Sequence, residues 1–129
     1  MIMVITYRPE LRDRVVERLR RCGYEVAVPP HRQDVLDGVS QINPDLIILD
    51  MYVADPSGLE MLRRIRRAEY RGKVVVLGGA SLSTVLSTAQ ALGVDQVVSG
   101  LELNNSTFDL GPLEAAVRAA LPPSPEVGV

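Results

Sequence analysis

The sequence predicts a doubly wound α/β domain, in which helices cover both faces of one five-stranded parallel sheet. Short, wholly apolar runs such as 46–49 and 74–77 are typical of parallel strands buried on both faces. Segments whose apolar residues recur at helical spacing separate these runs, so strands and helices alternate along the chain. The crossovers between parallel strands are then expected to be right-handed.

The first half of the chain is expected to form three strands and two helices. Pro9 suits the start of the first helix, because the N–H that proline lacks has no helical partner at that position. Gly23 suits its end. The expected elements are a strand at 1–5, a helix at 9–22, a strand at 24–28, a helix at 33–42 and a strand at 46–49.

The second half continues the alternation. Asp55 or Ser57 is expected to cap a helix whose buried stripe contains Leu59, Leu62 and Ile65, with the arginines of 63–67 in solvent. A small-residue helix and a final helix follow, separated by a strand and a long loop. The expected elements are a helix from about 58, a strand at 74–77, a helix at 81–92, a strand at 94–98, a loop at 100–111 and a helix at 112–121.

The composition indicates one globular domain of 129 residues, which we place at 1–121, with a flexible tail at 122–129. The formal net charge of −2 gives no general attraction to nucleic acid or membranes, and no apolar run approaches the length of a membrane span. Cys22 is the only cysteine, so the chain has no internal disulfide, which fits a reducing cytoplasm. We expect Cys22 to be a core thiol and the lone His31 to lie in a surface loop.

Strand order 2-1-3-4-5, the flavodoxin-like arrangement, is the order that we predict for the sheet. It brings the carboxyl ends of strands 1, 3 and 4 together, where open α/β sheets place their ligands. Asp50 ends the central strand, and the glycine pair before Ser81 could hold an anion at a helix N-terminus. The predicted crevice residues are Thr6, Tyr7, Asp50, Met51, Gly78, Gly79 and Ser81.

Four segments together resemble the receiver domain of two-component response regulators, the family of the chemotaxis receivers. PELRDRVVERLRRCGYEV is similar to its first helix and second strand, and PDLIILDMYVADPSGLEMLRRIR to its phosphorylation strand, with a glycine eight residues after the aspartate. ALGVDQVV is similar to the region of its fifth strand, and FDLGPLEAAVRAAL to its last helix. The resemblance covers nearly the whole chain and implies a flavodoxin-like fold.

In that family an acidic pair and the acceptor aspartate hold Mg²⁺, while a lysine and a Thr or Ser meet the phosphoryl oxygens. The resemblance assigns the acceptor to Asp50 and leaves the other positions without their usual side chains. The acidic pair corresponds to Thr6 and Tyr7, the Thr/Ser to Gly78 or Ala80, the lysine to Gly100 or Ser106, the aromatic to Val97 and a frequent proline to Ala54. Lys73, the only lysine, precedes the fourth strand and so belongs at its opposite end.

We therefore predict an atypical receiver, or pseudo-receiver, that is not an enzyme and acts by binding a partner protein or a second copy. The expected contact surface is the last two helices with the 100–111 loop. No catalytic residue, metal or other cofactor is expected. One alternative is a working receiver, phosphorylated on Asp50 by a histidine kinase with Mg²⁺. Another is a small-ligand or nucleotide sensor that uses the crevice.

Overall fold

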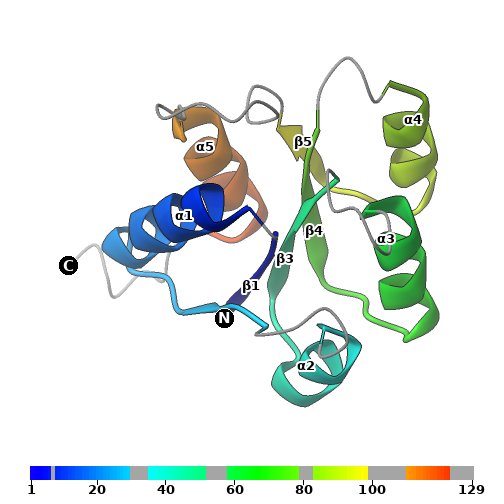
Figure 1. The fold of residues 1–129 in the computed structure, drawn as a ribbon, viewed down its shortest axis with the longest axis horizontal. Helices are drawn as coiled ribbons and strands as arrows, with labels where there is room; N and C mark the ends of the chain where they lie inside the picture. Colours follow the sequence, from blue (N-terminus) through cyan, green and yellow to red (C-terminus); the bar gives the residue numbers. More distant parts are fainter. Residues whose placement is uncertain (7, 30–34, 52–57, 79–82, 99–109, 123–129) are drawn as a thin grey trace.

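The computed structural model describes residues 1–6, 8–29, 35–51, 58–78, 83–98 and 110–122. Its strands form the middle layer, with α1 and α5 on one side and α3 and α4 on the other (Figure 1). The elements are β1 (Ile2–Ile5), α1 (Pro9–Arg21), β2 (Val26–Ala27), α2 (Val35–Ile42), β3 (Leu46–Asp50), α3 (Gly58–Arg67), β4 (Lys73–Leu77), α4 (Ser83–Ala91), β5 (Gln96–Val98) and α5 (Gly111–Ala120). None of the helices among the described residues is long and apolar enough to cross a membrane.

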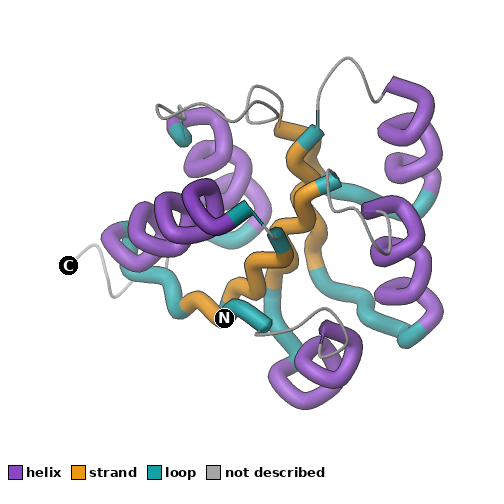
Figure 2. The backbone as a smooth tube through the Cα atoms, in the orientation of Figure 1, coloured by secondary structure: helices purple, strands orange, loops and turns teal. Residues whose placement is uncertain are grey.

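The sheet has the order β2-β1-β3-β4-β5, which confirms the predicted fold class. Every strand pair is parallel, and the strands form one continuous layer between the helices (Figure 2). The register pairs Ile5 with Leu49 and Asp50 with Leu77. The carboxyl ends of β1, β3 and β4 therefore lie side by side, as the predicted order requires.

The core is divided by the sheet into two clusters, because successive side chains of a strand point to opposite faces. In β1, Ile2 and Val4 pack with residues of α1 and α5, whereas Met3 and Ile5 pack with residues of α2 and α3. Residues 46–49 are all 0% exposed and alternate in the same way. Burial on both faces explains why these strands are apolar throughout.

The two edge strands are shorter than the sequence indicates. β2 is formed by Val26 and Ala27 instead of 24–28, and β5 begins at Gln96 instead of residue 94. Each of them has a neighbour on one side only, so fewer ladder hydrogen bonds extend it. The predicted caps Asp55 and Ser57 and the predicted loop residue His31 lie outside the described residues, as do residues 100–109 of the predicted 100–111 loop and 123–129 of the predicted 122–129 tail. Gly111, predicted as the end of that loop, begins α5.

Arg66 corrects the expectation that the arginines of 63–67 form a solvated face. Arg63, Arg64 and Arg67 are 43%, 47% and 71% exposed, but Arg66 is half-buried and donates to four carbonyl oxygens. The acceptors are the carbonyls of Tyr70, Gly72, Leu92 and Gly93, at 2.8, 3.3, 3.0 and 2.8 Å. Arg66 thus joins the two loops that lead into β4 and β5.

Tyr70 lies beside Arg66, at the amino end of the sheet. Its hydroxyl donates to the carbonyls of Pro44 at 2.9 Å and Lys73 at 3.3 Å, which fixes the entries of β3 and β4. Burial raises the pKa of Tyr70 to about 12. We call Arg66, Tyr70 and the carbonyls that they contact the amino-end cluster.

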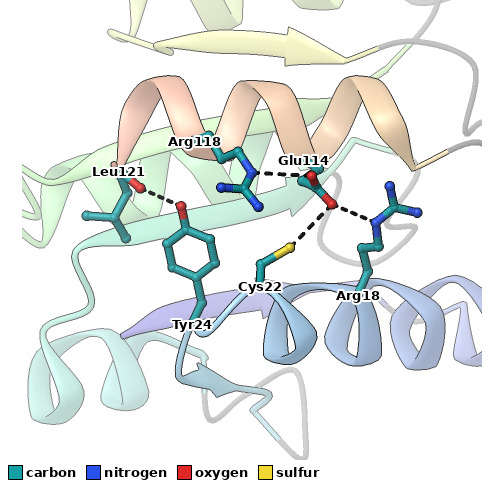
Figure 3. Close-up of polar contacts among 6 residues, drawn as sticks. All are labelled: Arg18, Cys22, Tyr24, Glu114, Arg118 and Leu121. Atoms are coloured by element: carbon teal, nitrogen blue, oxygen red, sulfur yellow. Dashed lines mark hydrogen bonds and ion pairs between the residues drawn. The ribbon is translucent and has the colours of Figure 1, made fainter. Parts of the chain in front are cut away.

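Cys22 corrects a second expectation, because its thiol is half-buried and polar in its contacts instead of lying in the core. Its Sγ lies 3.3 Å from Glu114 Oε1, and that oxygen also accepts from Arg18 Nε at 2.7 Å. Arg118 Nε lies 3.2 Å from the other oxygen of Glu114. These four residues form the α1–α5 cluster (Figure 3), which ties the two helices of one face together.

Candidate functional site

Asp50 ends the central strand and is buried to 1% exposure. Its position follows from the apolar run that precedes it, because a strand that is buried on both faces carries its last residue to the carboxyl edge of the sheet. Strand alternation places the side chain on the face of Leu46 and Ile48, which is the face covered by α1 and α5. A buried carboxylate requires hydrogen-bonding or charged partners.

Thr6 supplies the first partner. Ile5 pairs with Leu49 across the β1–β3 ladder, so the next residue of β1's chain lies beside Asp50. Thr6 is 3% exposed, and its Oγ1 donates to Asp50 Oδ2 at 2.7 Å. The threonine hydroxyl therefore lies at a position where the resemblance places an acidic side chain.

Arg8 supplies the second partner, and the sequence analysis did not identify it. Its Nε lies 2.8 Å from the same Oδ2 of Asp50, and its side chain is 19% exposed. Its backbone N–H donates to Thr6 Oγ1 at 3.3 Å, which orders the turn into α1. Arg8 is the N-cap residue, with an extended backbone, because Pro9 begins the helix directly after it.

Thr6, Arg8 and Asp50, which we call the carboxylate cluster, form a compact charged site in which a guanidinium balances the carboxylate. Hydrogen bonds between charged groups are short and strong, and this pair is largely shielded from solvent. Removal of either charge would leave the other buried without this counter-charge. The site is therefore balanced by the chain's own residues.

This set of side chains does not fit Mg²⁺. The metal prefers several hard oxygen ligands in near-octahedral geometry, whereas the carboxylate cluster offers one carboxylate, one hydroxyl and a cation. Among the described residues, no group of three His, Cys, Asp or Glu side chains could hold a metal. Lys73 begins β4 at the opposite end of the sheet, where its Nζ lies 3.7 Å from Asp95 Oδ1.

Two further predicted crevice residues contribute backbone rather than side-chain chemistry. Met51 is 6% exposed, and its N–H donates to the Leu77 carbonyl at 3.0 Å. Gly58 lies so close that a Cβ there would be 2.6 Å from Met51 Cα, which explains the glycine eight residues after Asp50. The N–H of Gly78 donates to the Val98 carbonyl at 2.9 Å, so it is already used within the sheet.

The other three predicted residues of the crevice, Tyr7, Gly79 and Ser81, lie outside the described residues. The aromatic position of the family corresponds to Val97, which is half-buried in β5. One signal in the sequence could have pointed to Arg8. It is the only cationic residue in the turn directly after β1, and that turn borders the carboxyl edge where Asp50 was expected.

Comparison with known proteins places this chain among response regulator receiver domains. A family model of the response regulator receiver domain matches residues 2–100. Transcriptional regulatory protein AfsQ1 of Streptomyces coelicolor is 33% identical over 108 residues, which are 80% of this chain and 43% of AfsQ1. Transcriptional regulatory protein BaeR of Escherichia coli is 28% identical over 107 residues, 83% of this chain and 40% of BaeR. The chain therefore spans less than half the length of these two relatives.

Solved structures give the same fold. The receiver domain of NtrX from Brucella abortus superposes with a TM-score of 0.81 at 21% identity, covering 96% of this chain and 100% of that domain. Vibrio cholerae chemotaxis protein CheY4 gives a TM-score of 0.76 at 19% identity, covering 93% of this chain and 97% of CheY4. At these identities the likeness concerns the fold.

Proposed function

Since this chain belongs to the response regulator receiver domain family, we propose that it is an atypical receiver in two-component-type signal transduction. In this proposal the chain acts by binding other proteins, and Mg²⁺-dependent phosphorylation of Asp50 has been lost. The observation that carries the proposal is the contact of Arg8 Nε and Thr6 Oγ1 with one oxygen of Asp50, at 2.8 and 2.7 Å.

The chemistry of phosphoryl transfer supports this proposal. The acceptor carboxylate must approach a phosphoryl group whose oxygens are neutralised by a metal ion and by fixed cations. Here the described side chains beside Asp50 satisfy the carboxylate itself, and Thr6 and Tyr7 stand where the family has its acidic pair. These contacts stabilise the unphosphorylated carboxylate and are not stronger in the transition state, so they do not accelerate phosphoryl transfer to Asp50.

The partner surface belongs to the same proposal. We place the folded unit at 1–121, since α5 ends at Ala120. We place its contact surface at α4, α5 and the predicted 100–111 loop, whose last residue, Gly111, begins α5. Because several relatives are transcriptional regulators, a regulatory partner is favoured over an enzymatic role of the domain itself. A second copy of the chain is the other partner that this surface would suit.

The carboxylate cluster also favours a second candidate function. A guanidinium can meet the oxygens of a phosphoryl group as well as a carboxylate. If Arg8 turned from Asp50 to such a group, it would supply positive charge that a metal supplies elsewhere. In that case Asp50 would be phosphorylated by a histidine kinase without Mg²⁺ at the site.

The test combines a small phosphodonor with intact mass measurement, and beryllofluoride with amide NMR. The variants are Asp50→Asn, which removes the acceptor, and Arg8→Gln, which removes the cation. A third variant, Thr6→Asp with Tyr7→Asp and Arg8→Ala, restores the family's acidic pair. We expect the unmodified chain to gain no phosphate and to show no shifts near Asp50 at millimolar Mg²⁺, whereas the third variant binds Mg²⁺.

A phosphate that requires both Mg²⁺ and Asp50 would overturn the proposal. A phosphate that forms without Mg²⁺, and is lost in both Asp50→Asn and Arg8→Gln, would establish the second candidate instead. If the third variant, which carries Thr6→Asp, Tyr7→Asp and Arg8→Ala, also fails to bind Mg²⁺, then the missing acidic pair is not what excludes the metal.

A further inference from the structure

The start of α1 depends on residues that lie outside the helix. Arg8, the N-cap residue, makes no side-chain cap hydrogen bond, because an arginine side chain has no acceptor atom. The first bond of the helix runs from the Arg12 N–H to the Arg8 carbonyl at 2.9 Å. The N–H of Arg8 itself donates to Thr6 Oγ1 at 3.3 Å. The contacts that hold Arg8 therefore determine how firmly the first turn is closed.

Asp50 holds Arg8 in two ways. Its Oδ2 accepts directly from Arg8 Nε at 2.8 Å. The same oxygen accepts from the Thr6 hydroxyl at 2.7 Å, and the hydroxyl oxygen in turn accepts from the Arg8 N–H. Hydrogen bonds that form a chain polarise one another, so the charge of the carboxylate strengthens the bond between Thr6 and the backbone of Arg8. One carboxylate oxygen thus fixes both the side chain and the backbone of the N-cap residue.

The positions at which the family responds to its aspartate are filled differently here. Neither Gly78 nor Ala80 has the hydroxyl of the family's Thr or Ser, and the Gly78 N–H is bonded to the Val98 carbonyl. Val97 stands at the aromatic position. In the part of the chain that the structure describes, the hydrogen bonds of Asp50 lead to the start of α1 instead.

From these contacts we propose that the carboxylate cluster couples the state of Asp50 to the first turn of α1. While Oδ2 accepts from Thr6 and Arg8, the N-cap residue is fixed and the first turn is closed. When a modification of the carboxylate or a competing cation occupies that oxygen, both bonds are lost together and the turn opens. The opening stays local, because Leu11 and Val15 are fully buried in the core beneath α1 and hold the body of the helix.

This inference goes beyond the proposed function. It concerns a conformational response at α1, whereas the proposed function concerns lost phosphorylation and a contact surface at α4, α5 and the 100–111 loop. The coupling depends only on which groups Oδ2 of Asp50 accepts from, and not on whether the carboxylate takes phosphate. The two proposals can therefore fail separately.

Amide hydrogen exchange in the ¹⁵N-labelled full chain tests the coupling. The readout is the exchange rate of the Arg12 amide divided by that of the Glu114 amide. Glu114 makes the corresponding first bond of α5, to the Leu110 carbonyl at 2.9 Å, and α5 also starts with a proline and without a side-chain cap. Both helices cover the same face of the sheet, so the ratio corrects for changes in overall stability (Figure 1).

Asp50→Asn removes the charge with little change in shape. We expect it to raise the exchange ratio about fivefold, which is the size expected for the loss of a helix cap. Thr6→Val removes the hydroxyl and keeps the branched shape, so it should raise the ratio as well. Thr6→Ser keeps the hydroxyl and should leave the ratio at the wild-type value. Exchange of amides from Val15 onward should not change in any of these variants.

The proposal is wrong if Asp50→Asn leaves the ratio unchanged, or if it accelerates exchange at Arg12 and Glu114 equally. It is also wrong if Thr6→Val and Thr6→Ser give the same ratio, because the hydroxyl would then not connect the carboxylate to the helix. If Asp50→Asn does not fold, the two threonine variants decide between coupling and its absence.

Discussion

Each end of the sheet contains an arginine and a hydroxyl side chain, but these groups bind different acceptors at the two ends. At the carboxyl end, Thr6 and Arg8 both contact one buried carboxylate, that of Asp50. At the amino end, Arg66 and Tyr70 donate to backbone carbonyls and contact no acidic group at hydrogen-bond distance in the described structure. An arginine at each end is therefore fixed for a different reason.

The carboxylate cluster is a candidate functional site, whereas the amino-end cluster has a structural role. The carboxylate cluster contains two opposite charges whose balance can change if one of them is modified, replaced or redirected. The amino-end cluster contains one permanent charge held by neutral acceptors in the loops before β4 and β5. A change at the carboxyl end should therefore alter both stability and chemistry, whereas a change at the amino end should alter stability alone.

Replacement of Arg8 is expected to have the largest effect. Arg8→Ala leaves the Asp50 carboxylate buried without its guanidinium, which should lower the free energy of unfolding by about 3 kcal/mol. Urea unfolding measures it, with the 47% exposed Arg64 replaced by Ala as a matched control. In a double-mutant cycle with Asp50→Asn, additive effects would contradict a coupled pair.

Replacement of Arg66 should come next. Arg66→Ala removes a guanidinium that donates to four carbonyls, and we expect a loss of about 2 to 3 kcal/mol. Arg67 lies on the same helix and is 71% exposed. Arg67→Ala should therefore change the free energy of unfolding by no more than about 0.5 kcal/mol. Equal effects of the two substitutions in urea unfolding would show that the amino-end cluster does not hold the loops.

Tyr70 gives a smaller and pH-dependent effect. Tyr70→Phe removes one hydroxyl with two acceptors and should cost about 1 to 2 kcal/mol near neutral pH. Because folding raises the pKa of Tyr70 from 10 to about 12, the hydroxyl's contribution is complete below pH 10 and is lost as the pH rises toward 12. The difference between the two proteins in unfolding free energy should shrink over that range, and a constant difference would argue against a protonated donor.

Replacement of Glu114, in the α1–α5 cluster, should change stability least. This cluster lies near the surface and serves as a reference for the two more buried clusters. Hydrogen bonds from Arg18 and then from Cys22 lower the pKa of Glu114 from 4.5 to about 2. A lowered pKa means that the ionised carboxylate stabilises the fold above pH 4.5 and loses this effect as the pH falls toward 2. Melting temperatures of the wild type and Glu114→Gln should therefore converge over that interval, and a gap that persists at acid pH would be inconsistent with this account.

Much of the fold could be predicted because it depends on local pattern. The apolar run that ends at Asp50, the helical spacing after Pro9 and the alternation of strands and helices were sufficient for the fold class. The sheet order was chosen among the known doubly wound orders and is confirmed by the structure. The lengths of β2 and β5 were not predictable in this way, since they depend on how many neighbours each strand acquires in the sheet.

The polar contacts were less accessible to sequence reasoning. Arg8 reaches an oxygen that is 42 residues away in the chain. Its place in the turn after β1 brings it near the edge of the sheet, but no local pattern shows that its side chain turns to Asp50. Arg66 looks like its neighbours Arg64 and Arg67 in any pattern of charge, and only the carbonyls of the two loops that meet it in the fold distinguish it. Cys22 continues an apolar helix face, but α5 brings Glu114 against that position.

The position of Arg8 in the chain has a consequence for how the site responds to its surroundings. A dissolved ion occupies a site according to its concentration, and a chelator can remove it. A guanidinium that is covalently attached two residues beyond Thr6 remains at a high effective concentration beside Asp50. We therefore expect the charge balance of this carboxylate to change little with the divalent-ion content of its medium.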